Sequence, residues 1–319
     1  MAKALGEAFD VSAEFFTNLQ NAYDLSKAKK PDPGIAIRRQ IQNHYPLREM
    51  ILRGWINNAD TSLMGAQLAR FFEVDSLGNV PHLAHAAKKS SRYYEEIPAI
   101  QLAWLFRVRQ LAKSMHVSAY SHKALLQATE KMKLLLNSPE EIRHVPRLLQ
   151  ESGVRIVVVE GLPGGKIDGV CFWLHRQAPV IGLSLRFDRI DNFWFVLRHE
   201  IEHVLQKHGL DREIIDVSLE TGDTAGNQEE EIANNAASEF CIPQREVKSF
   251  YDRKWPFISA RDVVAFAMRM NVHPGIIVGQ IQRRAKRWDF LRDYQVKIRH
   301  LLLPYIYVDG WGDIPQVDL

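Results

Sequence analysis

The spacing of apolar side chains changes near the middle of the chain, from a helical period to the period of strands. In residues 98–115 and 118–136 the apolar positions recur every three or four residues, which predicts two long amphipathic helices. Short β-branched and aromatic runs bounded by Gly and Pro then predict strands at 154–160, 169–174 and 179–185. Helical spacing returns over five later segments, at 191–207, 228–241, 243–251, 259–271 and 274–285.

This order of elements predicts an α+β fold, with a helical N-terminal half followed by a domain that contains a small β-sheet. Because the three strands are short and close together in sequence, we expect them to pair as an antiparallel sheet. An extended ligand could then pair with the strand near 180–185, which we expect at the edge of the sheet.

Composition narrows the class of protein without identifying it. The chain has 319 residues, of which 46% are hydrophobic and 25% charged, as in ordinary globular proteins. Residues 1–150 carry 20 Lys and Arg against 14 Asp and Glu, and residues 151–319 carry 21 against 24, so the net charge of +3 does not indicate general binding of polyanions. Two cysteines far apart, no signal-peptide pattern and no long apolar segment lead us to expect a cytoplasmic protein that does not bind a membrane.

Residues 199–203 have the pattern HExxH within a helix that is apolar on both sides of the motif. The side chains of His199 and His203 lie one turn apart on the same face, so both imidazoles can reach one metal ion. Glu200 is placed to activate a water molecule on such an ion. The alternative is a solvent-facing helix that happens to carry two His and two Glu, but its apolar flanks predict that the helix is partly buried.

A third ligand is expected from the helix at 228–241, which begins with Glu229, Glu230 and Glu231. A catalytic zinc site takes three protein ligands and keeps one position open. Glu230 is our choice, with Glu229 as the second, because Glu230 lies one turn before Asn234, which could accept a hydrogen bond from a ligand imidazole. The alternative is that these acids stabilise the N-terminus of their helix instead of binding a metal ion.

The later histidine His208 is five residues after His203 and directly precedes Gly209, so we interpret it as a residue of the helix C-terminus and not as a ligand. The extended HExxHxxGxxH pattern is absent, because residue 206 is Gln.

Two segments together resemble the ImmA/IrrE family of metallopeptidases. In that family an HExxH helix is followed by a helix with the pattern ExxANxFAxxxLxP. Residues 198–205 match the first helix, and residues 230–243 match the second, with Glu230, Ala233, Asn234, Ala237 and Pro243 in register. Segments 182–195 and 272–282 are also similar to the family, the latter to members fused to a helix-turn-helix module.

The resemblance implies a zincin-like domain and a zinc-dependent endopeptidase of the gluzincin type. It assigns His199, His203 and Glu230 as Zn²⁺ ligands and Glu200 as the catalytic base. Members of the family often cleave a DNA-binding repressor, so the implied partner is a protein substrate, a transcriptional repressor or an antitoxin-like protein. The chain departs from the family pattern at Glu202, where Gly or Ala is usual, at Lys207, where His is usual, and at the Asn-Ala pair 235–236, where a Phe is usual in second place.

Residues 1–30 resemble the C-terminal half of a HigA-type antitoxin helix-turn-helix. Because the recognition helix of that family lies upstream of the matching segment, we do not expect this chain alone to bind a specific DNA sequence. The expected division is therefore a partial helix-turn-helix segment at 1–30, a helical domain at 35–148, the peptidase domain at 150–300 and a tail at 301–319.

Two other functions remain open at this stage. One is a DNA-binding regulator or antitoxin whose peptidase-like domain is not catalytic, and the other is a protein in which zinc only stabilises the fold. The second would need a fourth ligand, and no residue of the sequence is an obvious candidate for one.

Overall fold

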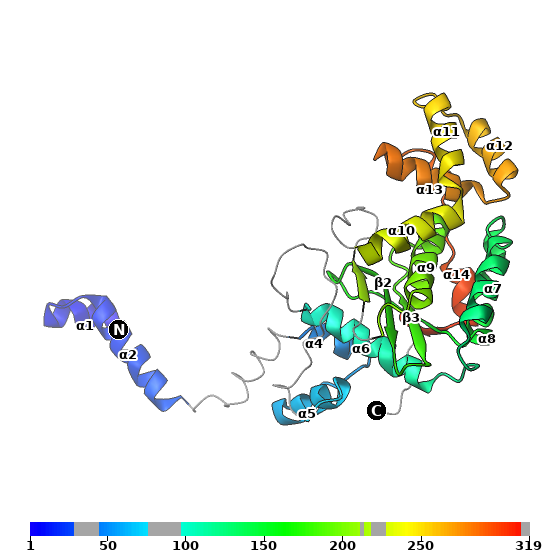
Figure 1. Ribbon diagram of the computed structural model, residues 1–319. Helices are drawn as coiled ribbons and strands as arrows, with labels where there is room; N and C mark the ends of the chain where they lie inside the picture. The colour runs from blue at the N-terminus through cyan, green and yellow to red at the C-terminus, as the bar shows by residue number, and fades with distance from the viewer. Residues whose placement is uncertain (29–44, 76–96, 211–213, 218–227, 314–319) are drawn as a thin grey trace.

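A five-stranded mixed sheet lies between helices on both of its faces (Figure 1). The computed structural model describes residues 1–28, 45–75, 97–210, 214–217 and 228–313, with the backbone alone for 62 and 214–217. The fold is α+β, as predicted. The strands are β1 (Arg155–Val159), β2 (Ile167–Trp173), β3 (Pro179–Leu183), β4 (Ile214–Val217) and β5 (Tyr307–Asp309).

The order of strands is β4-β2-β3-β1-β5. We expected antiparallel pairing throughout, and this prediction is wrong for two of the four strand pairs. β2 pairs antiparallel with β3 and β4, whereas β1 pairs parallel with β3 and β5. The hairpin from β2 to β3 sets the antiparallel pair. β1 lies beside β3 and not beside its sequence neighbour β2. The chain reverses direction between β2 and β3, and β3 therefore runs parallel to β1.

The position of β3 also corrects the expectation that residues 180–185 form a free edge. β3 pairs with β2 on one side and with β1 on the other, so its backbone groups are already used within the sheet. In the described part of the chain the edge strands are β4 and β5.

Helix α6 (Ala99–Ser114) covers one face of the sheet and helix α9 (Ile190–Leu205) covers the other. β1 alternates between the two: Val157 and Val159 pack with α6, and Ile156 and Val158 pack on the side of α9. Strands buried on both faces need nearly continuous apolar sequence, which is why 155–159 reads Arg-Ile-Val-Val-Val.

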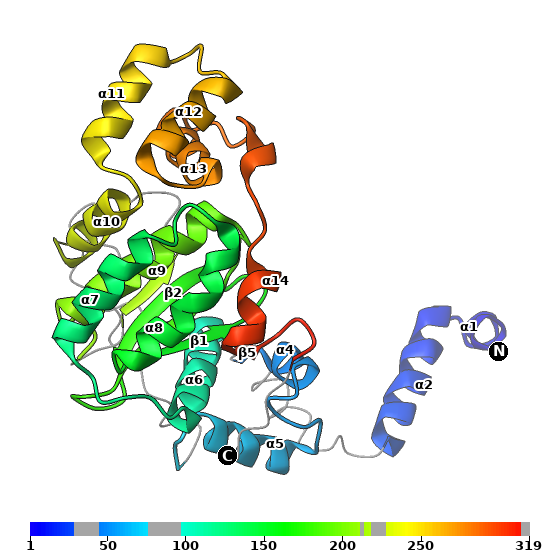
Figure 2. The same ribbon diagram turned by 90° about the vertical axis from the view of Figure 1, so that its right-hand side faces the viewer.

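The helices of the second half begin and end close to their expected positions. α10 (Gln228–Cys241) packs along α9, and α13 (Pro274–Ala285) packs on α9 as well. With α11 (Gln244–Lys254) and α12 (Ala260–Met270), α13 forms a group on the side of α10 away from the sheet (Figures 1 and 2).

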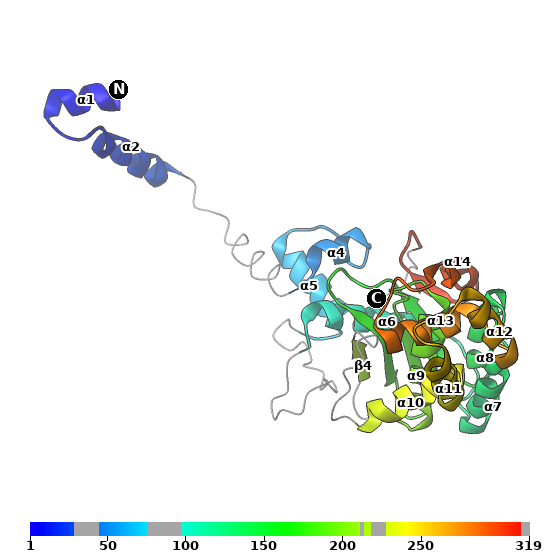
Figure 3. The same cartoon turned by 90° about the horizontal axis from the view of Figure 1, so that it is seen from above.

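The helices of the first half do not form one separate layer. Helices α4 (Leu47–Leu52) and α5 (Thr61–Phe71) lie beside α6 and share its core (Figure 3). α7 (His122–Lys133), the 3-10 helix η2 (Pro139–His144) and α8 (Val145–Glu151) contribute to the core on the side of α9. Each of the two cores therefore includes residues from both sides of the boundary expected near residue 150.

The two ends of the chain are built differently. α1 (Ala2–Phe9) and α2 (Ala13–Lys27) pack on each other, within the segment expected as a partial helix-turn-helix. Near the C-terminus the short elements η4 (Arg292–Tyr294), α14 (Arg299–Leu302) and η5 (Leu303–Tyr305) lead into β5. The segment expected as a tail thus supplies, in its described part, a strand of the sheet.

Candidate metal centre

Helix α9 places the HExxH residues in the interior of the molecule. His199, Glu200 and His203 have no exposed surface, and the apolar residues around them, from Phe193 to Val204, fix the helix against the sheet. This burial excludes the solvent-facing alternative. A buried polar group is costly unless it has a partner, so three adjacent buried polar side chains indicate a functional cluster.

Helix α10 brings Glu230 to the same cluster. Glu230 lies in the first turn of α10 and is 3% exposed. The small side chains of Ala233 and Ala237 follow on the face that is completely buried, which lets α10 approach α9 closely. The alanines of α10 thus lie where the two helices come closest.

The three side chains converge on one point. The Nε2 atoms of His199 and His203 are 3.0 Å apart. Nε2 of His199 lies 3.4 Å from Oε2 of Glu230, and Nε2 of His203 lies 3.5 Å from Oε1 of the same carboxylate. Among the described residues, this is the one group of three or more His, Cys, Asp or Glu side chains arranged to hold a metal ion.

These distances fit a tetrahedral metal ion. Bonds of about 2.0–2.1 Å at tetrahedral angles place ligand atoms about 3.3–3.5 Å apart, close to the observed separations of 3.0–3.5 Å between the two Nε2 atoms and the carboxylate oxygens. Two imidazoles and one carboxylate are also a ligand set that catalytic zinc sites use. The residues present therefore fit zinc.

Neither cysteine belongs to this group. Cys171 and Cys241 are both buried as free thiols. Burial raises the pKa of Cys241 to about 12, so its thiol stays protonated near neutral pH, and the protonated form is a poor metal ligand.

The carboxylate of Glu200 packs against strand β2 at Gly169, where any side chain would collide with it. A Cβ atom built on Gly169 would lie 2.0 Å from Oε1 of Glu200 and 2.8 Å from its Cδ. The register of the pairing between β2 and β4 shifts between Ile167 and Gly169, next to the candidate base.

His208, which we interpreted as a helix-terminal residue, contacts the candidate ligand His203. Its Nδ1 lies 2.9 Å from Nδ1 of His203, on the side of the ring opposite Glu230. Lys207 and Gly209 have positive φ and turn the chain back after α9. The carbonyl of His208 accepts a hydrogen bond from Trp173 Nε1 at 3.0 Å, which ties the turn to β2.

The hydrogen bond expected from Asn234 is not formed in the structure. Its Oδ1 is buried and has no hydrogen-bond partner among the described residues. The residue that contacts a candidate ligand imidazole is instead His208, which lies beside His203. In the sequence, the feature that could have identified His208 is its place directly after the HExxH helix and before a glycine.

The neighbouring acids are held away from the cluster. Glu231 is exposed, and Glu229 is not part of the group. Glu202, which departs from the family pattern, accepts hydrogen bonds from Arg198 at 2.7 Å and from Gln206 at 2.7 Å along α9. Its charge is thus paired within the helix and does not point at the ligands.

The comparison with family models agrees with this geometry. Residues 150–278 match the model described as the IrrE N-terminal-like domain, Peptidase_M78. No curated protein matches the chain. The match covers the sheet strands β1 to β4, both helices of the candidate metal centre and the first turns of α13, and it confirms the family predicted from the motif. None of the described helices has both the length and the apolar character needed to cross a membrane.

Proposed function

We propose that the IrrE N-terminal-like domain of this chain, residues 150–278, is a zinc-dependent endopeptidase. The observation that carries the proposal is the convergence of two imidazole nitrogens from α9 and one carboxylate from α10 at separations of 3.0–3.5 Å. His199, His203 and Glu230 would hold the ion. When bound, zinc would supply a Lewis acid that polarises the scissile carbonyl and makes water a better nucleophile at neutral pH.

Glu200 has the position of a general base in this arrangement. It follows the ligand His199 directly and is buried beside the ligand pair. Its carboxylate would take a proton from the attacking water and later deliver it to the leaving amine. Gly169 leaves the space that the carboxylate occupies, and β2 limits its movement.

His208 would serve as a positioning residue for His203. The Nδ1 contact at 2.9 Å involves the ring nitrogen that does not face Glu230. A partner at this nitrogen fixes both the tautomer and the ring orientation of a ligand imidazole. This is the role that we had expected of Asn234.

The substrate would bind as an extended strand along β4. β4 is an edge strand of the described sheet and pairs with β2 at Gly169, the residue in contact with Glu200. A peptide added to this edge would therefore pass close to the candidate base. We propose a regulatory protein as the substrate, a repressor or an antitoxin-like protein, because the family resemblance implies one.

The test is the substitution Glu200→Gln, which keeps the size of the side chain and removes the base. We expect the purified variant to retain one zinc per chain by elemental analysis, and to cleave a repressor encoded beside this chain about 10²–10⁴-fold more slowly than wild type. Glu231→Gln, on the exposed side of α10, is the matched control and should leave both zinc content and cleavage unchanged.

Two further outcomes separate the parts of the proposal. Glu230→Gln should lower zinc content, and retention of full zinc by this variant would contradict the ligand assignment. If wild type holds stoichiometric zinc and leaves every neighbouring regulator intact, the endopeptidase function is overturned, and a domain that binds without cutting remains.

A further inference from the structure

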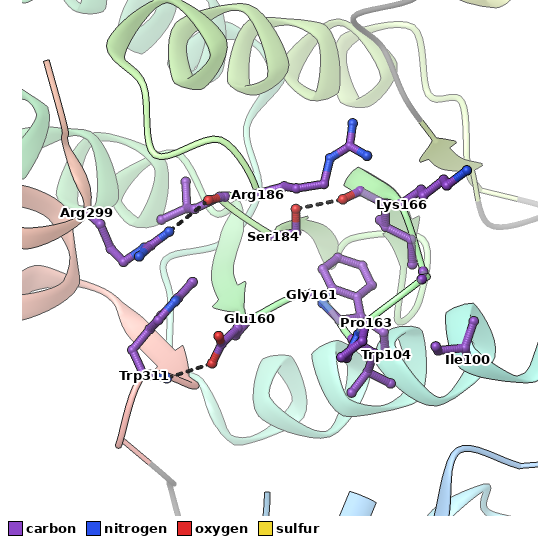
Figure 4. A pocket seen from close by; sticks show the side chains of 15 residues that line it. Ile100, Trp104, Glu160, Gly161, Pro163, Lys166, Ser184, Arg186, Arg299 and Trp311 are labelled. Atoms are coloured by element: carbon purple, nitrogen blue, oxygen red, sulfur yellow. Dashed lines mark hydrogen bonds between the residues drawn. The ribbon is translucent and has the colours of Figure 1, made fainter. Parts of the chain in front are cut away.

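A cavity lies apart from the candidate metal centre, at the carboxyl ends of β1, β3 and β5. It has a volume of about 300 Å³ and is lined by the loop after β1, the end of β3, α6 and the C-terminal segment. None of His199, His203 or Glu230 lines it. Figure 4 shows Arg299, Glu160 and Trp311 on one side of this cavity, with Lys166 and Ile100 on the other.

The topology of the sheet favours a ligand at this position. β3, β1 and β5 are parallel, and β1 lies between the other two. After β1 the chain therefore continues to strands on one flank of β1, and it later reaches β5 on the opposite flank. In sheets with parallel strands, ligands bind outside the carboxyl ends where connections diverge in this way.

Two opposite charges line the cavity without forming an ion pair. One oxygen of Glu160 accepts the backbone N–H of Trp311 at 2.8 Å, and the other oxygen makes no hydrogen bond with the described residues. Arg299 donates from Nη2 to the carbonyl of Leu185 at 3.3 Å. Its Nε is buried and has no hydrogen-bond partner among the described residues.

The guanidinium of Arg299 is held in place on the wall of the cavity. It lies 4.2 Å from the ring centroid of Trp311, and its Nη1 is 3.9 Å from Oδ2 of Asp188. Arg186, which also lines the cavity, is paired with Asp168 through contacts of 3.1 and 3.4 Å. The guanidinium of Arg299 and the carboxylate of Glu160 thus lie at fixed positions on the same side of the cavity, and Lys166 lies on the other side.

Apolar side chains make up much of the remaining lining, beside the polar Lys166 and Ser184. Ile100 and Trp104 come from α6, Leu162 comes from the loop after β1, and Leu185 follows β3. The volume is at the small end of the range for ligand pockets, about 300–1,000 Å³. A ligand that satisfies all of these surfaces has an ammonium group for Glu160, a carboxylate for Arg299 and an apolar side chain.

We propose that this cavity binds a free aliphatic α-amino acid. The carboxylate of the amino acid would accept hydrogen bonds from the guanidinium of Arg299, and the ammonium group would donate to the second oxygen of Glu160. The side chain would contact Trp104 and Ile100. The site is separate from the peptidase function, and its occupancy can be measured without any cleavage assay.

The test uses the full chain and isothermal titration with L-leucine, beside leucinamide and N-acetyl-leucine. Leucinamide lacks the carboxylate, and N-acetyl-leucine lacks the ammonium group. We expect saturable binding of one L-leucine per chain and, for each analogue, affinity weaker by about tenfold or more, because one charged hydrogen-bonding group is lost. Thermal denaturation should show a matching rise in Tm with L-leucine.

Variants assign the binding to this cavity. Glu160→Gln keeps an acceptor for Trp311, and Arg299→Gln keeps a polar side chain, and each should weaken L-leucine binding by about tenfold or more. The exposed Arg292→Gln and Glu231→Gln are the matched controls and should bind as wild type does.

Three results would overturn the proposal. The first is the absence of any Tm shift with the aliphatic amino acids at about 10 mM, a concentration that reveals even millimolar affinity. The second is equal binding of L-leucine and both analogues by wild type, which requires no variant to fold. The third is binding that survives in folded Glu160→Gln and Arg299→Gln chains.

Discussion

Glu200 and Gly169 show how the chemistry of the candidate site depends on a missing side chain. The carboxylate of Glu200 fills the space where a Cβ of residue 169 would lie, 2.0 Å from Oε1. Glu200 is completely buried, so its carboxylate cannot swing into solvent to relieve a clash. The position of the candidate base is therefore set by β2 as much as by its own helix.

Gly169→Ala should displace this carboxylate without changing any metal ligand. We expect zinc content to stay at the wild-type level and kcat to fall by about 10²-fold, the effect of moving a catalytic group by about 1 Å. Gly161→Ala is the matched control, because a Cβ there would meet only the Cβ of Ser184 at 3.7 Å. Elemental analysis and a cleavage assay check both variants, and unchanged kcat in Gly169→Ala would show that Glu200 is not the base.

The sequence predicted the residues of the candidate metal centre more fully than the residues that support them. HExxH and the helix that follows it fix which side chains share a face, because α-helical spacing is a local property. The contact of His208 with His203 depends on a turn with two positive φ angles, at Lys207 and Gly209, after the helix ends. Turn geometry of this kind is not visible in a helical period, and so His208 was missed and Asn234 was preferred.

At the scale of elements, the apolar pattern predicted helices and strands but not the neighbours of each strand. The runs at 154–160 and 179–185 are nearly continuous, which identifies strands buried on both faces but gives no direction of pairing. β4 and β5 have only four and three residues, too few to show a period. The mixed sheet therefore follows from long-range packing that the pattern does not encode.

The N-terminus of α13 depends on a histidine as its cap, which predicts a pH dependence of stability. Nδ1 of His273 accepts a hydrogen bond from the backbone N–H of Gly275 at 3.0 Å, an interaction that protonation removes. Burial lowers the pKa of His273 below its usual 6.5, and Glu140 raises it by a smaller amount. The unfolded chain thus binds the proton more tightly than the folded chain does, and the folded state is destabilised when pH falls below about 6.5.

His273→Asn keeps a capping acceptor and removes the titration. We expect urea unfolding to show that wild type loses more stability than this variant between about pH 7.5 and pH 5.5, with the difference absent above about pH 7.5. The exposed His300→Asn should behave as wild type at each pH. Parallel losses in wild type and His273→Asn would show that the cap does not titrate in this range.

At the scale of the whole molecule, one buried carboxylate joins parts of the chain that lie far apart in sequence. Asp309 of β5 is completely buried and forms an ion pair with Arg107 of α6. The same carboxylate accepts a hydrogen bond from Trp55 Nε1 at 3.0 Å, from the segment after α4. The last strand of the sheet, the helix α6 that covers it and the segment after α4 are thereby fixed to one another, across the boundaries expected near residues 150 and 300.

Asp309→Asn tests whether these parts unfold together. The substitution preserves shape but removes the charge of the carboxylate that pairs with the buried Arg107, and breaking a buried pair costs about 3–5 kcal/mol in comparable cases. We expect a loss of this size in the free energy of unfolding by urea, in one transition when followed both by tryptophan fluorescence and by circular dichroism. Asp313→Asn, in the exposed turn after β5, should cost less than about 0.5 kcal/mol.

A loss below about 1 kcal/mol in Asp309→Asn, or a separate early transition of α4 to α6, would show that the first half folds independently of the sheet. A single transition would instead mean that the peptidase-like domain needs residues outside 150–278 for its stability, because its sheet is completed by β5 and covered by α6.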